Sequence, residues 1–134
     1  PSSYVPNRNA LMLTVTHALA QKLGYDTIVT GVCQTDYSGY PDCRDEFIQN
    51  LAKTLNIGSN SSIVIQTPLM YLSKAETFRM AKELGGLDLI INESHTCYNG
   101  IRDEKHEWGY GCGECPACLL RKKGYENYAT SNNQ

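Results

Sequence analysis

Four of the six cysteines are spaced in a way that suits a bound metal ion. Cys112, Cys115 and Cys118 form the run Cys-Gly-Glu-Cys-Pro-Ala-Cys, and Cys97 precedes this run by fifteen residues. A structural zinc ion takes four soft ligands, with each sulfur about 2.3 Å from the metal, and a Cys-x2-Cys-x2-Cys run can place three sulfurs around one ion. We therefore predict that these four cysteines bind a single zinc ion.

Other uses of four thiols fit the sequence less well. Cysteines separated by only two other residues form strained disulfides. An iron–sulfur cluster is a closer alternative, but the ferredoxin run ends Cys-x3-Cys-Pro, whereas Cys118 is followed by Leu-Leu-Arg-Lys-Lys. Gly111 and Gly113 allow the tight backbone turns that a zinc knuckle needs. Because sulfur fills all four positions, no position remains for an activated water molecule, and we expect a structural ion.

The same region is rich in positive charge. Five of the twelve basic residues lie between positions 101 and 124, where they could offset the negative charge of a zinc ion bound by four thiolates or simply cover a solvated helix end. They are Arg102, Lys105, Arg121, Lys122 and Lys123.

Composition limits the classes of function. The chain has 134 residues, of which 41% are hydrophobic, and no apolar stretch approaches the roughly 20 residues that cross a bilayer. The net charge of -2 argues against sequence-independent binding to nucleic acid, which needs a surplus of cations. Nothing at Pro1 or after it looks like a secretion signal. We expect a cytoplasmic protein without membrane or direct nucleic-acid partners, and the missing initiator Met suggests a piece of something longer.

The elements expected along the chain alternate between helix and strand. Asn7 or Asn9 can cap a first helix that Gly24 ends. The apolar face of this helix is expected to comprise Leu11, Val15, Ala18 and Leu19. A β-branched strand at residues 27–32 and a long polar loop at residues 33–44 follow.

The second half of the α/β pattern repeats this alternation. A helix beginning near Asp45 carries Phe47, Ile48, Leu51 and Leu55 on one face, and a strand follows at residues 63–67. Ser73 and Glu76 form a capping box for a third helix, which Gly85 and Gly86 close. Two parallel strands do not make a self-sufficient sheet, so we expect further strands upstream. In such sheets ligands bind beyond the carboxyl ends of the strands, which places residues 33–44 and 68–76 beside a site.

Four segments, in order, resemble the 7-cyano-7-deazaguanine synthase family of the queuosine pathway. The segments are Val-Pro-Asn-Arg-Asn at 5–9, Gly-Val-Cys-Gln-Thr-Asp-Tyr-Ser-Gly-Tyr-Pro-Asp-Cys-Arg-Asp-Glu-Phe at 31–47, Thr-Pro-Leu-Met with Ser-Lys-Ala-Glu at 67–76, and Cys-Tyr-Asn-Gly at 97–100 with the cysteine knuckle. Together they span most of the chain. Any one of them alone would be a weak signal.

The resemblance implies a fold and a domain arrangement. The family belongs to the N-type ATP pyrophosphatases, whose doubly wound parallel sheet is of the adenine-nucleotide alpha-hydrolase type. Its members carry an N-terminal Ser-Gly-Gly-x-Asp-Ser loop for ATP phosphates, and this sequence has none. We therefore interpret the chain as the C-terminal half of such an enzyme. Residues 1–92 would be part of the α/β domain, and residues 93–134 a helical zinc-binding segment.

The resemblance also implies chemistry. The enzyme would be an ATP-dependent carbon–nitrogen ligase, using ATP with Mg²⁺ to convert 7-carboxy-7-deazaguanine and ammonia to 7-cyano-7-deazaguanine, and it would be a homodimer. Asp36 and Lys74 are the candidate catalytic residues. The candidate substrate-binding residues are Arg8, Asn9, Tyr37, Tyr40, Asp42 and Arg44. Lys74 and Arg8 would each stand at a helix N-terminus, where phosphate is favoured, and Asp42 could accept from the donors of a guanine-like edge.

Plainer interpretations of the same residues stay open. Lys74 could be only a helix start, Arg8 a solvated residue and Asp42 a turn former beside Pro41. The chain as a whole could be a zinc-stapled structural or interaction domain, and we expect it to be inactive alone because the phosphate loop is absent. A zinc-ribbon nucleic-acid binder would need two separate knuckles and a basic face, and the sequence has one knuckle and a pI of about 5.9.

Overall fold

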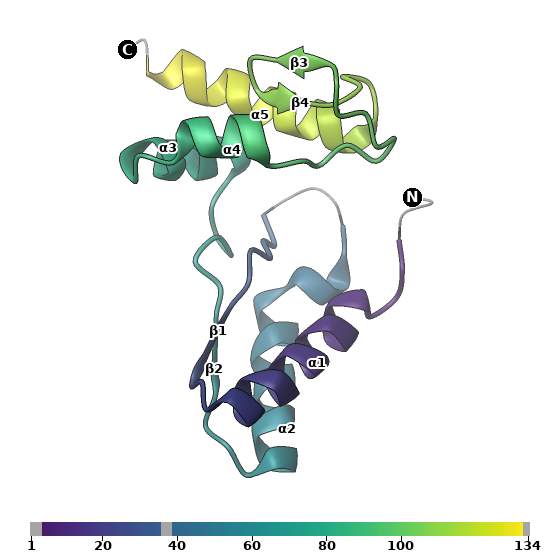
Figure 1. Cartoon of the computed structure of the whole chain (residues 1–134), viewed down its shortest axis with the longest axis vertical. Helices are drawn as coiled ribbons and strands as arrows, with labels where there is room; N and C mark the ends of the chain where they lie inside the picture. Colours follow the sequence, from purple (N-terminus) through teal and green to yellow (C-terminus); the bar gives the residue numbers. More distant parts are fainter. Residues whose placement is uncertain (1–3, 36–38, 133–134) are drawn as a thin grey trace. The chain divides into compact units, whose positions relative to one another are not determined.

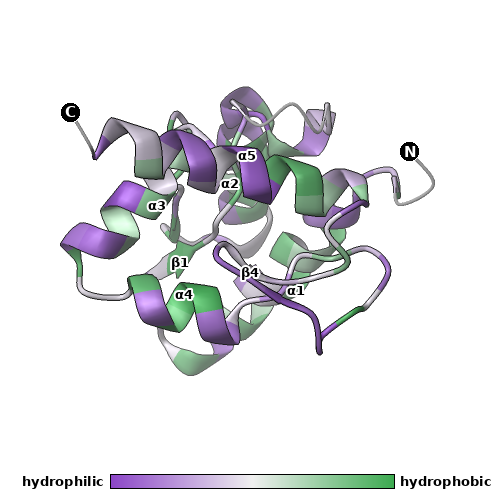
Figure 2. Cartoon of the chain, turned by 90° about the horizontal axis from the view of Figure 1, so that it is seen from above, coloured by the Kyte–Doolittle hydropathy of each residue, from purple (hydrophilic) through white to green (hydrophobic). Residues whose placement is uncertain are grey.

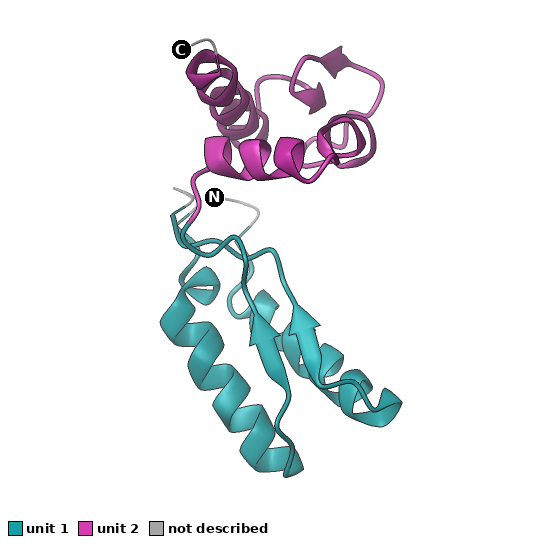
Figure 3. Cartoon of the chain, turned by 90° about the vertical axis from the view of Figure 1, so that its left-hand side faces the viewer, with its two compact units in different colours: residues 1–71 teal, residues 72–134 magenta. Residues whose placement is uncertain are grey.

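The computed structural model describes residues 4–35 and 39–132. The chain divides into two compact units, residues 1–71 and residues 72–134, shown in teal and magenta in Figure 3. The two units are compact parts of the chain and need not coincide with functional domains. The division into an ATP pyrophosphatase-like part at residues 1–92 and a zinc-binding segment at residues 93–134 stays a prediction.

Unit 1 is built on two short parallel strands. It contains α1 (Arg8–Leu23), β1 (Thr27–Val29), the 3-10 turn η1 (Pro41–Cys43), α2 (Asp45–Ser59) and β2 (Val64–Gln66), labelled in Figure 1 except for η1. Ile28 pairs in register with Ile65, and both side chains enter a core with residues of α1 and α2. Both helices therefore cover the same face of the sheet. The predicted α/β class with a small parallel sheet is confirmed.

The buried face of α1 differs from the expectation. Leu13, His17 and Ala20 are its buried residues, whereas Leu11, Val15 and Leu19 are exposed. The buried His17 is satisfied by a hydrogen bond of 2.9 Å between its Nε2 and Asn56 Oδ1. The prediction that this apolar face packs into the core was therefore wrong. The core of unit 1 contacts the opposite side of the helix.

The two ends of α1 and the buried face of α2 lie where the sequence predicts them. Gly24 ends α1 with a φ of 77°, as predicted. At the other end, Asn7 is the N-cap but makes no side-chain cap bond. In α2 the predicted Ile48 is fully buried, and Phe47 and Leu51 pack against the same core.

Unit 2 consists of three helices and a small hairpin. Its elements are α3 (Lys74–Glu83), α4 (Leu87–Glu93), β3 (Lys105–His106), β4 (Gly109–Tyr110) and α5 (Pro116–Ser131). Ser73 and Glu76 form both bonds of the predicted capping box, and these bonds to Ser73 lower the pKa of Glu76. Figure 2 shows hydrophobic residues on α4, although none of them is buried.

The packing of α3 on α5 depends on a glycine. A Cβ atom on Gly124 would lie 2.5 Å from the Cβ atom of Lys74, so only glycine allows this approach. Farther along the same interface Phe78 packs edge-on against Tyr125, with ring centroids 5.4 Å apart. Among the described residues, no helix combines the length and the hydrophobicity that crossing a membrane would require.

Candidate metal centre

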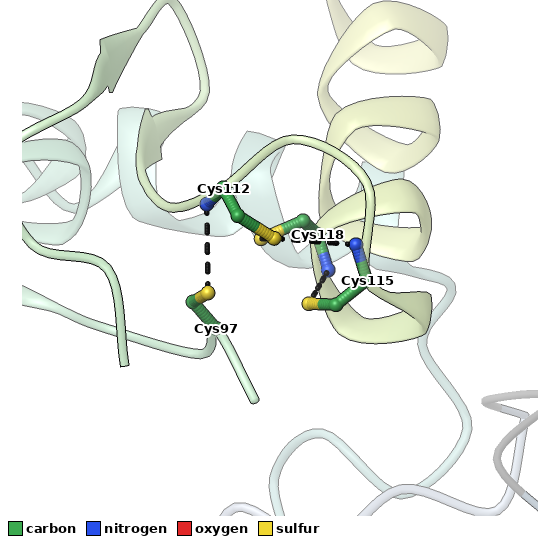
Figure 4. A group of neighbouring side chains, drawn as sticks. All are labelled: Cys97, Cys112, Cys115 and Cys118. Atoms are coloured by element: carbon green, nitrogen blue, oxygen red, sulfur yellow. Dashed lines mark hydrogen bonds between the residues drawn. The ribbon is translucent and has the colours of Figure 1, made fainter. Parts of the chain in front are cut away.

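The four predicted cysteines converge in unit 2, where their sulfur atoms all lie within 4.8 Å of one another (Figure 4). The Sγ atoms of Cys112 and Cys118 are 3.9 Å apart. Tetrahedral ligands about 2.3 Å from one zinc ion would be separated by about 3.8 Å, so this spacing suits that ion. Cys97, Cys115 and Cys118 are buried, and Cys112 is partly exposed.

Backbone N–H groups point at the sulfurs around the knuckle. Cys112 N donates to Cys97 Sγ at 3.4 Å, Cys115 N to Cys112 Sγ at 3.3 Å, and Cys118 N to Cys115 Sγ at 3.4 Å. Figure 4 shows these bonds as dashed lines. Hydrogen bonds of this kind stabilise thiolate over thiol and so prepare the sulfurs to bind a cation.

The surroundings of the cysteines shift the pKa values of their thiols in opposite directions. Burial opposes ionisation of Cys97, but N–H groups of Cys112, Ile101 and Asn99 outweigh it and lower its pKa to about 6. Burial raises the pKa of Cys118 to about 12. A divalent cation among the sulfurs favours the thiolate form of every ligand. The donor set, its spacing and its hydrogen bonds all fit zinc.

Two glycines allow the backbone of the knuckle to pass close to the cysteine sulfurs. A Cβ atom on Gly111 would lie 2.5 Å from Cys118 Sγ, and Gly113 has a φ of 78° that side chains rarely adopt. The sequence prediction for these glycines is confirmed. Beside them, the ring of Trp108 is buried against the cysteines and stacks on His106 with centroids 4.4 Å apart.

Among the five basic residues between positions 101 and 124, only Arg121 is buried. Arg121 is 4% exposed, whereas Arg102, Lys105, Lys122 and Lys123 are solvated. Its guanidinium donates to the carbonyl oxygens of Trp108 at 2.7 Å, Ile90 at 3.0 Å and Ser94 at 3.3 Å. Burial lowers the pKa of Arg121, and the nearby Cys118 opposes this shift.

Arg121 therefore connects three segments around the centre. The carbonyls of Ile90 and Ser94 belong to the last turn of α4 and its C-cap, where a helix presents partial negative charge. Trp108 belongs to the turn between β3 and β4. Asn99 was another residue whose role the sequence did not reveal: its Nδ2 donates to Cys112 Sγ at 3.4 Å.

In unit 1 the segments that follow the two strands meet, as the sheet topology predicts. Gln34 N donates to Met70 O at 3.1 Å, and Asp45 N donates to Gln34 Oε1 at 3.0 Å. Tyr71 also donates to Asp45 Oδ2 at 2.8 Å, a bond that raises the pKa of Tyr71.

The candidate substrate residues have varied positions. Asp42 is buried, and its Oδ2 accepts from Asn9 N at 3.0 Å and Asn9 Nδ2 at 3.2 Å. Tyr40 stacks on Tyr4 with centroids 5.7 Å apart. Arg8 and Arg44 are exposed. Asp36 and Tyr37 lie outside the described residues.

The candidate catalytic Lys74 belongs to unit 2. It is the first residue of α3 and is half-buried, with its aliphatic stem over Gly124 of α5. It therefore has a packing role in addition to any role of its charge.

The model of the family described as queuosine biosynthesis protein QueC matches residues 1–129. The chain belongs to the QueC family. Relatives named 7-cyano-7-deazaguanine synthase agree with this: that of Wolinella succinogenes is 60% identical over 98% of the chain, and that of Helicobacter pylori strain Shi470 is 58% identical over 98%. That of Halorhodospira halophila is 51% identical over 96% of the chain.

The chain is shorter than these members of the QueC family. The matched residues make up 56% of the Wolinella synthase, 58% of the Helicobacter synthase and 53% of the Halorhodospira synthase. It thus spans a little over half the length of the curated relatives it matches.

Proposed function

We propose that this chain is the part of an ATP-dependent 7-cyano-7-deazaguanine synthase that carries its structural zinc centre. The complete enzyme would adenylate the carboxylate of 7-carboxy-7-deazaguanine, and ammonia would displace AMP to give an amide. A second activation, at the amide oxygen, would then allow the nitrile to form. The match of the QueC family to nearly the whole chain is the observation that supports this proposal most strongly.

Zinc would be held by Cys97, Cys112, Cys115 and Cys118, whose spacing and donors suit it. Four sulfur ligands fill a tetrahedral ion, so zinc would cross-link the knuckle, the Cys97 loop and α5 without taking part in the reaction. Arg121 would add positive charge beside this anionic centre while joining α4 and the hairpin to it.

The substrate roles follow from position at the ends of the strands. Residues 33–44 leave the carboxyl end of β1, the edge at which wound sheets present ligands. We propose that Asp42, Tyr40 and Arg44 contact the deazaguanine there, together with Tyr37, and that Arg8 and Asn9 assist. Lys74, with Asp36, would serve the activation step, its ammonium facing phosphate while its stem packs on α5.

Other aspects of the proposal concern the assembled enzyme. It would use ATP with Mg²⁺, work in the cytoplasm, form a homodimer and bind no nucleic acid directly. Because the phosphate loop of the family is absent from the sequence, we propose that the chain is inactive alone and acts only with the remainder of a synthase. A zinc-stapled interaction domain is therefore the second candidate, and the four-cysteine cluster with its own small core in unit 2 favours it.

A chimera tests the function. The matched residues of the Wolinella synthase would be replaced by this chain, and the chimera would be incubated with 7-carboxy-7-deazaguanine, ATP and ammonia. Formation of 7-cyano-7-deazaguanine, detected by mass spectrometry, is the expected result. The intact Wolinella synthase is the positive control, and a Lys74→Ala chimera should lose ATP–pyrophosphate exchange. A folded chimera with bound metal but no product would contradict the proposal.

A further inference from the structure

The exposed side of α1 carries an apolar stripe. Its members are between 53% and 68% exposed, and they are Leu11, Met12, Val15, Leu19 and Leu23. At 3.6 residues per turn these five fall within an arc of about 120° on the helix. The residues that α1 buries, Leu13, His17 and Ala20, lie on the other side. An isolated surface Leu needs no explanation, but a stripe of five on one helix is typical of a contact surface.

The sheet beside this helix is also incomplete. In the part of the chain that the structure describes, β1 pairs with β2 and with no other strand. On the face away from α1 and α2, Val29 is 65% exposed and Val64 is 54% exposed. Parallel sheets occur almost only with both faces covered. In the described residues each strand of this two-stranded sheet has one unpaired edge. The helix α1 contacts β1, so the apolar stripe belongs to a helix that lies over one of these strands.

The curated relatives are longer than this chain, and their additional length is a source of cover for these surfaces. Somewhat under half of the Wolinella and Helicobacter synthases has no counterpart in this chain. We propose that the stripe Leu11, Met12, Val15, Leu19 and Leu23 docks that remaining part of a synthase, with Val15 and Leu19 as its central anchors. The occupant is a polypeptide that supplies further parallel strands with covering helices.

A second copy of this chain is a poorer occupant. It brings no strand or helix that is absent here, and two copies related by a twofold axis would bring their β1 edges together antiparallel. The remaining part of a synthase can extend the sheet beyond β1 and cover the stripe at the same time. The proposal rests on family membership and on the exposed surfaces, and it does not depend on the reaction that the enzyme catalyses.

The test is co-production of this chain, with an affinity tag, together with the part of the Wolinella synthase that has no counterpart here. We expect a one-to-one complex by size-exclusion chromatography with light scattering. Val15→Glu with Leu19→Glu should weaken the complex by roughly a hundredfold or more, because two central apolar anchors become charged. Ile57→Glu is the matched control, since Ile57 is 73% exposed on α2 and should leave the complex intact.

Folding of the variant is checked separately. Its helix content by circular dichroism and its bound metal should match those of the unmodified chain, because both substituted side chains are exposed. Failure of the unmodified chain to retain the Wolinella segment would overturn the proposal, as would equal retention by the Val15→Glu, Leu19→Glu variant. A dimer of this chain alone that the same variant dissociates would assign the stripe to a second copy and would also overturn it.

Discussion

Asn9 and Asp42 are 33 residues apart in the sequence, and two hydrogen bonds to one carboxylate oxygen join them. Asp42 Oδ2 accepts from the backbone N–H of Asn9, in the first turn of α1, at 3.0 Å. The Asp42 carboxylate therefore caps the N-terminus of α1 in place of the N-cap residue Asn7, whose side chain makes no cap bond. The negative charge also suits the N-terminal end of the helix.

Replacing Asp42 separates its two possible roles. Asp42→Ala should lower the free energy of unfolding by about 1 to 2 kcal/mol, as loss of a helix cap does. Asp42→Asn keeps an oxygen that can accept from Asn9, so it should cost less. Urea denaturation measures both, with Glu46→Gln, an exposed carboxylate in the first turn of α2, as the control. Equal stability of Asp42→Ala and the unmodified chain would contradict the capping role.

A substrate role for Asp42 would show in binding. In the chimera, Asp42→Asn should weaken deazaguanine binding by about 1 to 3 kcal/mol, because an amide can present a donor to a donor. ATP binding should change little. Calorimetric titration of each ligand decides between the possibilities: equal losses for both would mean that the whole loop is disturbed, and no loss for either would remove Asp42 from the site.

Arg121 should matter far more than its charged neighbours on α5. Arg121→Met would leave the carbonyls of Trp108, Ile90 and Ser94 without their donor, at a cost on the order of 3 kcal/mol. Lys122→Met is the control, because the Lys122 side chain is 51% exposed and the change should stay within about 0.5 kcal/mol. Trp108 is the single tryptophan, so its fluorescence reports unfolding at the metal centre directly. Similar unfolding midpoints for the two variants would contradict this role.

Two glycines inside helices should respond to alanine in opposite directions. Gly124→Ala places a Cβ atom against Lys74 and should destabilise the chain by about 1 to 3 kcal/mol, despite the better helix propensity of alanine. Gly58→Ala meets no atom within 4 Å and should stabilise α2 by up to about 1 kcal/mol. Thermal denaturation compares them. A stabilising Gly124→Ala would mean that α3 does not approach α5 so closely.

Local signals in the sequence predicted the elements that are held by local interactions. The capping box at Ser73, the stop at Gly24 and the buried side of α2 depend on residues within a few positions of one another. The metal cluster was predictable for a similar reason, because ligand spacing restricts the loops that can surround one ion. Its supporting residues were not: Arg121 and Asn99 reach the centre through contacts that no spacing rule describes.

The elements that the sequence did not indicate are held by distant partners. The helix α4 is short, its N-cap Gly86 offers no side-chain cap, and it buries no residue. Each strand of the hairpin has two residues, Lys105–His106 and Gly109–Tyr110, and no β-branched side chain. The error on α1 has another cause. The sequence pattern suggested that the apolar residues Leu11, Val15 and Leu19 face the core, but the core of unit 1 uses the other side of the helix.

The metal content of the purified chain tests the central claim most directly. If Cys97, Cys112, Cys115 and Cys118 form one structural centre, elemental analysis should find about one zinc ion per chain. Cys115→Ser should lose the ion and unfold the segment from Cys97 onward, whereas Cys33→Ser, outside the cluster, should keep it. Iron in place of zinc, or a folded chain with almost no metal, would contradict the account.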